Sequence, residues 1–154
     1  MPADADPAAL ARAIDDARRH LLHFVEHCSD EQWASCPLGE ADPRSVAVIA
    51  DHVADAYGYL GTWIEALARG EDVTVDTTVV DDLNARHAAS VDAPTRATVT
   101  DHLNEAGDRI MALVCALRPE QLVLGGGRVA RLAHIAALHA ADHRAELADA
   151  LRTD

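Results

Sequence analysis

Two histidines stand four residues apart near the end of the chain, in the stretch LHAADHRAEL at positions 138–147. Residues at this spacing lie on one face of an α-helix, with Cβ atoms about 5–6 Å apart. Two imidazoles placed in this way can bind one metal ion at metal–nitrogen distances of about 2.0–2.1 Å. His139 and His143 therefore indicate metal chemistry, provided that a third ligand comes from another part of the fold.

A histidine in the first half of the chain has the right direction to be that third ligand. If residues 45–70 form a helix, His52 lies on the flank of its apolar face, near Ile49, whereas Asp51 and Asp55 are expected to point away. Three neutral imidazoles leave coordination positions open to water or substrate, and the ion lowers the pKa of a bound water or thiol. The pattern predicts a metal site formed by His52, His139 and His143.

The remaining histidines are separated by the helix face that they occupy. His20, His23 and His27 have equally suitable spacing, but they lie away from the apolar stripe of their helix, and we predict a solvated face there rather than a metal site. His134 is expected to point away from the pair on its helix. Three further positions stay open: His102 at the edge of an apolar face, His87 in a connecting segment, and Glu146 beside the pair.

A role in the core is the alternative for each of these side chains. A single buried histidine is more often held by hydrogen bonds than by a metal, and Glu146 is either an ordinary surface carboxylate or a partner that orients a ring N–H. Tyr59 and Trp63, on the flank of His52, either line a pocket or pack in the core. Burying three imidazoles without partners costs about 1–3 kcal/mol each, so their common direction favours a shared ion.

Four long helices must position these residues. Apolar residues at helical spacing predict them at about 7–28, 45–70, 95–117 and 128–151. Start and stop signals support these limits: Asp6 stands before Pro7, Ser45 follows Asp42-Pro43, and Gly70 ends the second helix. In the connection that follows the first helix, Ser29 with Gln32 forms a capping-box pattern.

The connection between the second and third helices, at residues 71–94, is too long for a tight turn, and we expect it to cross the molecule. A chain of 154 residues suffices for one core of ordinary size. The predicted fold is all-α: one domain at residues 1–154, built as a four-helix bundle with a long crossover between helices 2 and 3.

The composition argues against several partners. A formal net charge of -13 repels nucleic acid and anionic lipid, and no apolar run approaches the roughly 20 residues of a membrane span. The amino-terminal residues MPADADPAAL lack the basic and apolar parts of a secretory signal, which predicts a cytoplasmic protein. Cys28, Cys36 and Cys115 are odd in number and have no CxxC spacing, so we expect reduced thiols, with an unreactive Cys36.

Two segments resemble a known family. RSVAVIADHVADAYGYL, at positions 44–60, is similar to its metal-binding segment in the second helix, and LHAADHRAEL is similar to its closing HxxxHR element. The family is the DinB/YfiT-like superfamily of small bacterial metalloproteins, which includes mycothiol-dependent maleylpyruvate isomerases and bacillithiol transferases. The resemblance covers essentially the whole chain and implies a four-helix bundle, often dimeric. It also implies a metal triad of His52, His139 and His143, in agreement with the helix-face analysis.

The resemblance further implies an enzyme. A divalent ion, zinc or nickel, would hold a low-molecular-weight thiol as its thiolate, which would attack an electrophilic small-molecule substrate. Two alternatives remain from the residues alone. One is hydrolysis by metal-bound water with a carboxylate as base, and the other is a non-catalytic bundle in which His102 or a carboxylate completes a closed coordination set.

Overall fold

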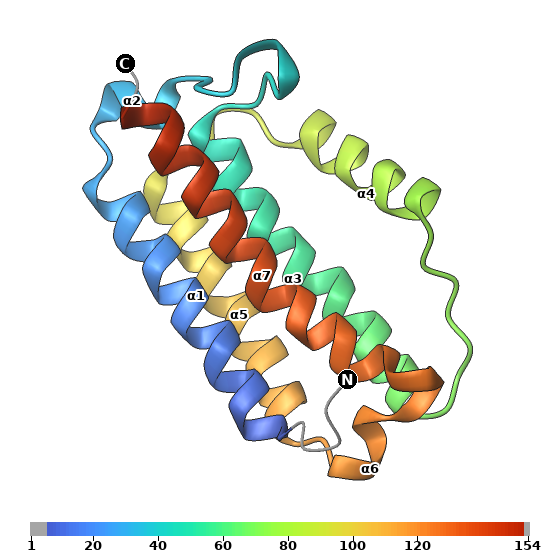
Figure 1. Ribbon diagram of the computed structural model, residues 1–154. Helices are drawn as coiled ribbons and strands as arrows, with labels where there is room; N and C mark the ends of the chain where they lie inside the picture. Colours follow the sequence, from blue (N-terminus) through green and yellow to red (C-terminus); the bar gives the residue numbers. More distant parts are fainter. Residues whose placement is uncertain (1–5, 153–154) are drawn as a thin grey trace.

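Four long helices form the body of the protein in the computed structural model, which describes residues 6–152 (Figure 1). The described residues contain no strand, so the predicted all-helical fold is confirmed. The long helices are α1 (Pro7–His27), α3 (Val46–Ala68), α5 (Arg96–Cys115) and α7 (Leu124–Arg152). Shorter helices are α2 (Asp30–Ala34), α4 (Thr77–Ser90) and α6 (Pro119–Leu122), and a 3-10 turn spans Gly39–Ala41.

Side-chain caps fix where the helices begin. The Asp6 carboxylate accepts hydrogen bonds from the first-turn N–H groups of α1, and the Ser45 hydroxyl accepts one from Val48 N–H at the start of α3. Ser29 and Gln32 form the predicted capping box at α2, in which each side chain bonds the backbone of the other. These starts agree with the sequence prediction.

Three consecutive glycines shape the beginning of α7. Gly125, Gly126 and Gly127 have φ values of 60°, 68° and 84°, in the left-handed region that other residues adopt only with strain. The regular right-handed part of α7 therefore begins at Arg128, where the sequence predicts the last helix to start.

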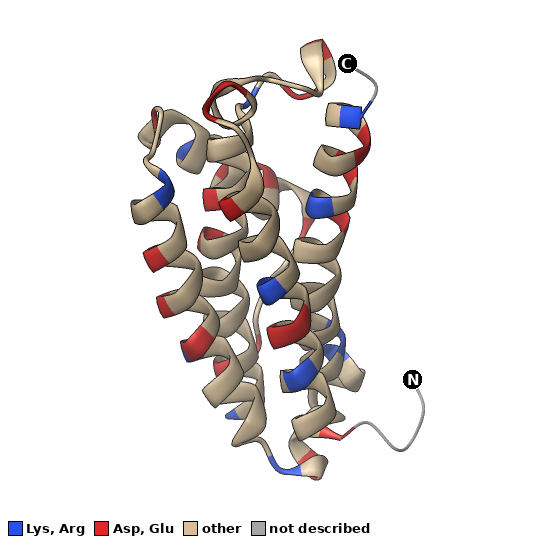
Figure 2. Ribbon diagram, turned by 90° about the vertical axis from the view of Figure 1, so that its left-hand side faces the viewer, with Lys and Arg blue, Asp and Glu red and all other residues tan. Residues whose placement is uncertain are grey.

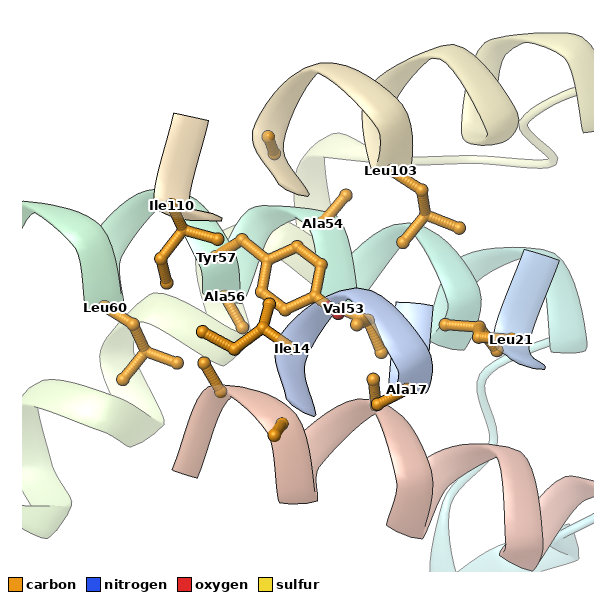
Figure 3. Packing of buried hydrophobic residues seen from close by; sticks show 14 of the residues in the cluster. Ile14, Ala17, Leu21, Val53, Ala54, Ala56, Tyr57, Leu60, Leu103 and Ile110 are labelled. Carbon is orange, nitrogen blue, oxygen red and sulfur yellow. The ribbon is translucent and has the colours of Figure 1, made fainter. Parts of the chain in front are cut away.

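The long helices are arranged so that α1 and α3 each pack against both α5 and α7. Thus α1 lies diagonally opposite α3, and α5 lies diagonally opposite α7. α3 and α5 run in the same direction (Figure 1). Large apolar side chains from three of these helices fill the centre in Figure 3: Ile14, Leu21, Val53, Tyr57, Leu103 and Ile110.

The crossover differs from the expected connection because it contains a helix, α4, at Thr77–Ser90. Since α3 and α5 are parallel, the chain must return along the whole of α3, about 35 Å at 1.5 Å per residue. α4 spans part of that return beside α3. Its only fully buried residue is His87, and its half-buried apolar residues, Val79, Val80 and Leu83, make an apolar stripe too short to predict a helix.

One buried cation joins α1 to α5. The guanidinium of Arg18, on α1, forms ion pairs with Asp15 at 2.7 Å and with Asp108 at 2.6 Å, and it donates to the backbone oxygen of Asn104. Gly107, on α5, leaves the space that this side chain fills, because a Cβ there would lie 2.4 Å from Arg18 Cδ.

The charged residues that Figure 2 shows lie mostly on the outer faces of the bundle. None of the described helices is both long and apolar enough to cross a membrane.

Candidate metal centre

The three predicted histidines meet between α3 and α7. Each offers a ring nitrogen, and these nitrogens all lie within 4.8 Å of one another. The ring centroids are 4.9 Å apart for His52 and His139, 5.4 Å for His52 and His143, and 4.5 Å for His139 and His143. A group of this kind, largely enclosed by the helices, could hold a metal ion.

Small residues on α7 allow the two helices to come close enough for this. The face that α7 buries is rich in alanine, including Ala133, Ala136 and Ala140, each with no exposed area. Because the alanine side chains are small, α3 and α7 lie close together, and the imidazoles of the triad fill the remaining space between them. His134, on the other side of α7, is exposed as predicted.

Burial keeps the triad neutral. The apolar surroundings lower the pKa of His52 to about 3 and that of His139 to about 4, and the neighbouring imidazole and Arg44 add to the effect in each case. Burial also lowers the pKa of His143, although Glu146 opposes the shift. At neutral pH each ring therefore carries a lone pair, which metal binding requires.

The positions of the ring nitrogens fit a metal ion. Nε2 of His52 and Nε2 of His139 lie 3.0 Å apart, and Nδ1 of His52 is buried without a hydrogen-bond partner among the described residues. Two ligands of a tetrahedral ion at 2.0–2.1 Å are separated by about 3.3 Å, so small movements would let both lone pairs share one cation. Nδ1 of His143 lies 3.3 Å from Oε2 of Glu146 but has no hydrogen-bond partner among the described residues, so neither ring nitrogen of His143 is committed elsewhere.

Charges of both signs border the triad. Arg44 donates two hydrogen bonds to Asp42, from Nε at 2.8 Å and from Nη2 at 2.7 Å, and this pair is half-buried. Asp42 is close enough to influence the pKa of His143, as is Glu146. Glu146 lies beside His143, but more than half of its side chain is exposed and Nδ1 of His143 has no hydrogen-bond partner among the described residues, so both roles considered for Glu146 stay open.

The prediction that Asp51 points away from the buried face is wrong. Asp51 is buried, and its carboxylate accepts hydrogen bonds from Nε2 of His87 at 2.7 Å and from Nδ1 of His102 at 2.8 Å. Although burial by itself raises the pKa of Asp51, these hydrogen bonds hold it below its usual value. The reason is α4, which covers this side of α3, so that α3 buries two faces instead of one.

The structure places the two histidines, His87 and His102, whose roles the sequence left open. His87 is buried, and its ring lies 5.6 Å from the ring of His52, so this imidazole belongs to the surroundings of the triad. His102 bonds Asp51 and is not part of the three-histidine group. The network of Asp51, His87 and His102 had no sequence signal, because its members come from three helices and one of those helices was not predicted.

The aromatic pair on α3 lies away from the triad. Tyr59 and Trp63 are half-buried and pack against each other, with ring centroids 5.0 Å apart. They follow His52 by about two and three helical turns, which favours the core-packing alternative over a pocket at the metal centre. The cysteines are free thiols, with Cys28 buried and Cys36 and Cys115 exposed.

The fold and this site define an all-helical bundle with a three-histidine group between two helices. Comparisons of the chain with protein-family models, with curated proteins and with solved structures find no match. The chemistry of the site is therefore argued from its own residues.

Proposed function

We propose that the protein is a metal-dependent enzyme in which His52, His139 and His143 hold one divalent ion, zinc or nickel. The observation that carries this proposal is the convergence of three neutral, largely buried imidazoles within 4.8 Å. Imidazole nitrogens suit zinc, nickel, copper and iron and suit magnesium or calcium poorly.

The absence of a fourth protein ligand favours a catalytic over a structural role. Among the described residues, no further histidine, cysteine or carboxylate joins the group, and His102 is held by Asp51. Structural zinc sites have four protein ligands, whereas catalytic sites keep a position open. When bound, an ion with three neutral ligands favours the anionic form of a thiol or water.

The reaction that we propose is the transfer of a low-molecular-weight thiol to a small electrophile. The thiol loses its proton, the sulfur forms a bond to the electrophilic carbon, and the leaving group departs with the pair of electrons. The choice of a thiol rests on the resemblance of the two histidine segments to the DinB/YfiT-like superfamily, which includes mycothiol- and bacillithiol-dependent enzymes. In this chain, Arg44 and Asp42 border the site and would orient a charged substrate.

Hydrolysis is the second candidate, and Glu146 is the observation that favours it. Its carboxylate lies 3.3 Å from the His143 ring and is open to solvent, as a base acting on water requires. The same three histidines would serve both reactions, so the thiol requirement distinguishes them.

The test compares the two reactions on the same protein. Protein loaded with zinc or nickel is mixed with a chromogenic aryl halide and either mycothiol or bacillithiol, and separately with an activated ester alone. We expect product only with thiol, loss of activity in His139→Ala, and full activity in His134→Ala. Ester hydrolysis without thiol would instead support the hydrolase, and stoichiometric metal with neither activity would support a non-catalytic bundle. A wild-type protein that binds no divalent metal overturns the thiol transferase, the hydrolase and the non-catalytic metal-binding bundle alike.

A further inference from the structure

We propose that α1 carries a second divalent-metal site, formed by His23, Glu26 and His27, with a small carboxylate as co-ligand from the adjoining hollow. One ligand atom from each of the three side chains lies within 4.8 Å of the other two. All three side chains are exposed, which confirms the predicted solvated face. The prediction of solvent exposure was correct, but exposure does not prevent metal binding.

The hydrogen bonding of His27 prepares it as a ligand. Its Nδ1 lies 2.8 Å from the backbone oxygen of His23, and a carbonyl oxygen accepts only, so Nδ1 carries the proton. Nε2 is then left with its lone pair, and the ring is held in one orientation. Metal-binding histidines use the same arrangement, in which one ring nitrogen donates to a carbonyl or carboxylate and the other binds the metal.

The rings and the carboxylate share one face of a regular helix. The ring centroids of His23 and His27 are 4.0 Å apart, and Glu26 precedes His27 directly. Because these side chains are already in contact with solvent, burial does not penalise their charged or metal-bound forms. Two imidazoles and one carboxylate favour zinc, nickel, copper or cobalt over magnesium or calcium, which prefer oxygen ligands.

A hollow beside these residues supplies the co-ligand. It has a volume of about 500 Å³, lies between α1 and α7, and is lined by His23 and His27 together with Phe24, Cys28, Leu151 and Arg144. Arg144 is half-buried there and makes no ion pair among the described residues. A guanidinium beside a bound cation favours an anion between them, and a carboxylate with a short apolar tail fits both the charge and the apolar wall.

The site is tested in protein that lacks the triad, His139→Ala with His143→Ala, by zinc titration calorimetry and by the visible spectrum of bound Co²⁺. We expect one zinc per chain, at least tenfold weaker binding after His23→Ala or His27→Ala, and unchanged binding after His134→Ala. Acetate in place of chloride at equal ionic strength should strengthen zinc binding at least threefold, and Arg144→Ala should remove that difference.

Zinc binding that is absent, or that is unaffected by both α1 substitutions, overturns the metal site. Equal zinc affinity in acetate and chloride overturns the co-ligand. If the triad variant does not fold by circular dichroism, the stoichiometry of the wild type decides, since two zinc ions per chain should fall to one in His27→Ala. The triad is measured separately in that His27→Ala protein, so failure of the α1 site and failure of the proposed function are distinguishable.

Discussion

The imidazoles of the triad are kept uncharged by the apolar helices around them. His52 is 2% exposed, and its pKa of about 3 lies far below the ordinary value of 6.5. In the unfolded chain the same ring is protonated at mildly acidic pH. The difference makes the stability of the metal-free protein depend on pH.

The expected dependence has a definite sign. Between pH 6.5 and about 4 the unfolded state binds more protons at His52 and His139 than the folded state, so stability is fully present above pH 6.5 and falls as the pH is lowered. Each histidine should lower the free energy of unfolding by about 2 kcal/mol between pH 7 and pH 5. Urea denaturation of the metal-free protein at pH 7 and at pH 5 measures this change in the free energy of unfolding.

A variant without one of these groups is the control. His52→Gln should lose less stability between pH 7 and pH 5 than the wild type does, because it lacks a ring that charges on unfolding. His134→Gln, whose ring is exposed in the fold, should behave as the wild type does. An identical pH dependence in wild type and His52→Gln would contradict the burial argument.

A second prediction at this scale concerns Gly107. Replacing glycine by alanine inside a helix normally stabilises by about 1 kcal/mol. Here the new Cβ would lie 2.4 Å from Arg18 Cδ, so the Arg18 side chain must shift, and the shift disturbs its buried ion pairs with Asp15 and Asp108. We expect Gly107→Ala to lower the free energy of unfolding by about 1–3 kcal/mol.

Thermal denaturation compares this variant with Gly58→Ala. Gly58 lies on α3, and a Cβ there would meet no atom within 4 Å. The Gly58 variant should therefore be as stable as the wild type or more stable. Equal melting temperatures for the two variants would show that Arg18 moves at no cost.

Among the elements, α4 is the long connecting helix with the least buried surface. His87 is its only buried residue, and the Asp51 carboxylate is its partner. An isolated helix of this length is marginal in water, so α4 persists because it is docked on α3. The His87–Asp51 hydrogen bond is a buried polar contact between the two helices, so the loss of either partner should weaken the docking.

Removing His87 should therefore release α4 and leave the bundle intact. In His87→Ala we expect faster amide hydrogen exchange over residues 77–90 and unchanged protection in the buried turns of α1, α5 and α7. His102→Ala retains the bond between His87 and Asp51, so exchange in α4 should stay slow. Equal exchange in the two variants would assign the docking to another contact.

The elements also show what sequence reasoning could reach. The four long helices were predictable because each has an apolar stripe, and in α1, α3 and α5 a side-chain cap marks the start, as Ile14 with Asp6 illustrates for α1. α4 was not, because its one buried side chain is an imidazole. The error at Asp51 follows from the same cause, since periodicity along α3 assumed one covered face where the fold has two.

The residues of the candidate site could be predicted from the sequence more fully than the residues around it. His139 and His143 are four residues apart on one helix, so their common direction follows from helical geometry alone. His52 required only the correct face of α3. Asp42 and Arg44 lie in the turn before α3, where no periodic pattern predicts the direction of a side chain.

For the molecule as a whole, metal binding at the triad should stabilise the packing of α3 against α7. An ion that binds only the folded state adds about 2.7 kcal/mol to the free energy of unfolding at a free concentration one hundred times its Kd. We therefore expect zinc to raise the melting temperature of His27→Ala, in which the α1 ligands are incomplete, and a chelator to reverse the rise.

The comparison that decides this is His27→Ala with His139→Ala added. The double variant should show little or no zinc-dependent rise, because only one imidazole of the α7 pair remains. A rise of equal size in both proteins would place the stabilising ion outside the triad.

The diagonal arrangement of the long helices has a consequence for how the chain can be divided. A cut in the stretch between α3 and α4 separates α1 and α3 from α5 and α7, and neither fragment then contains two long helices that pack on each other. Each piece alone lacks a core, so the two should acquire structure only when mixed. His52 would be on one fragment and His139 and His143 on the other. Zinc bound by all three would link the fragments, so their affinity for each other should be higher with zinc than without it.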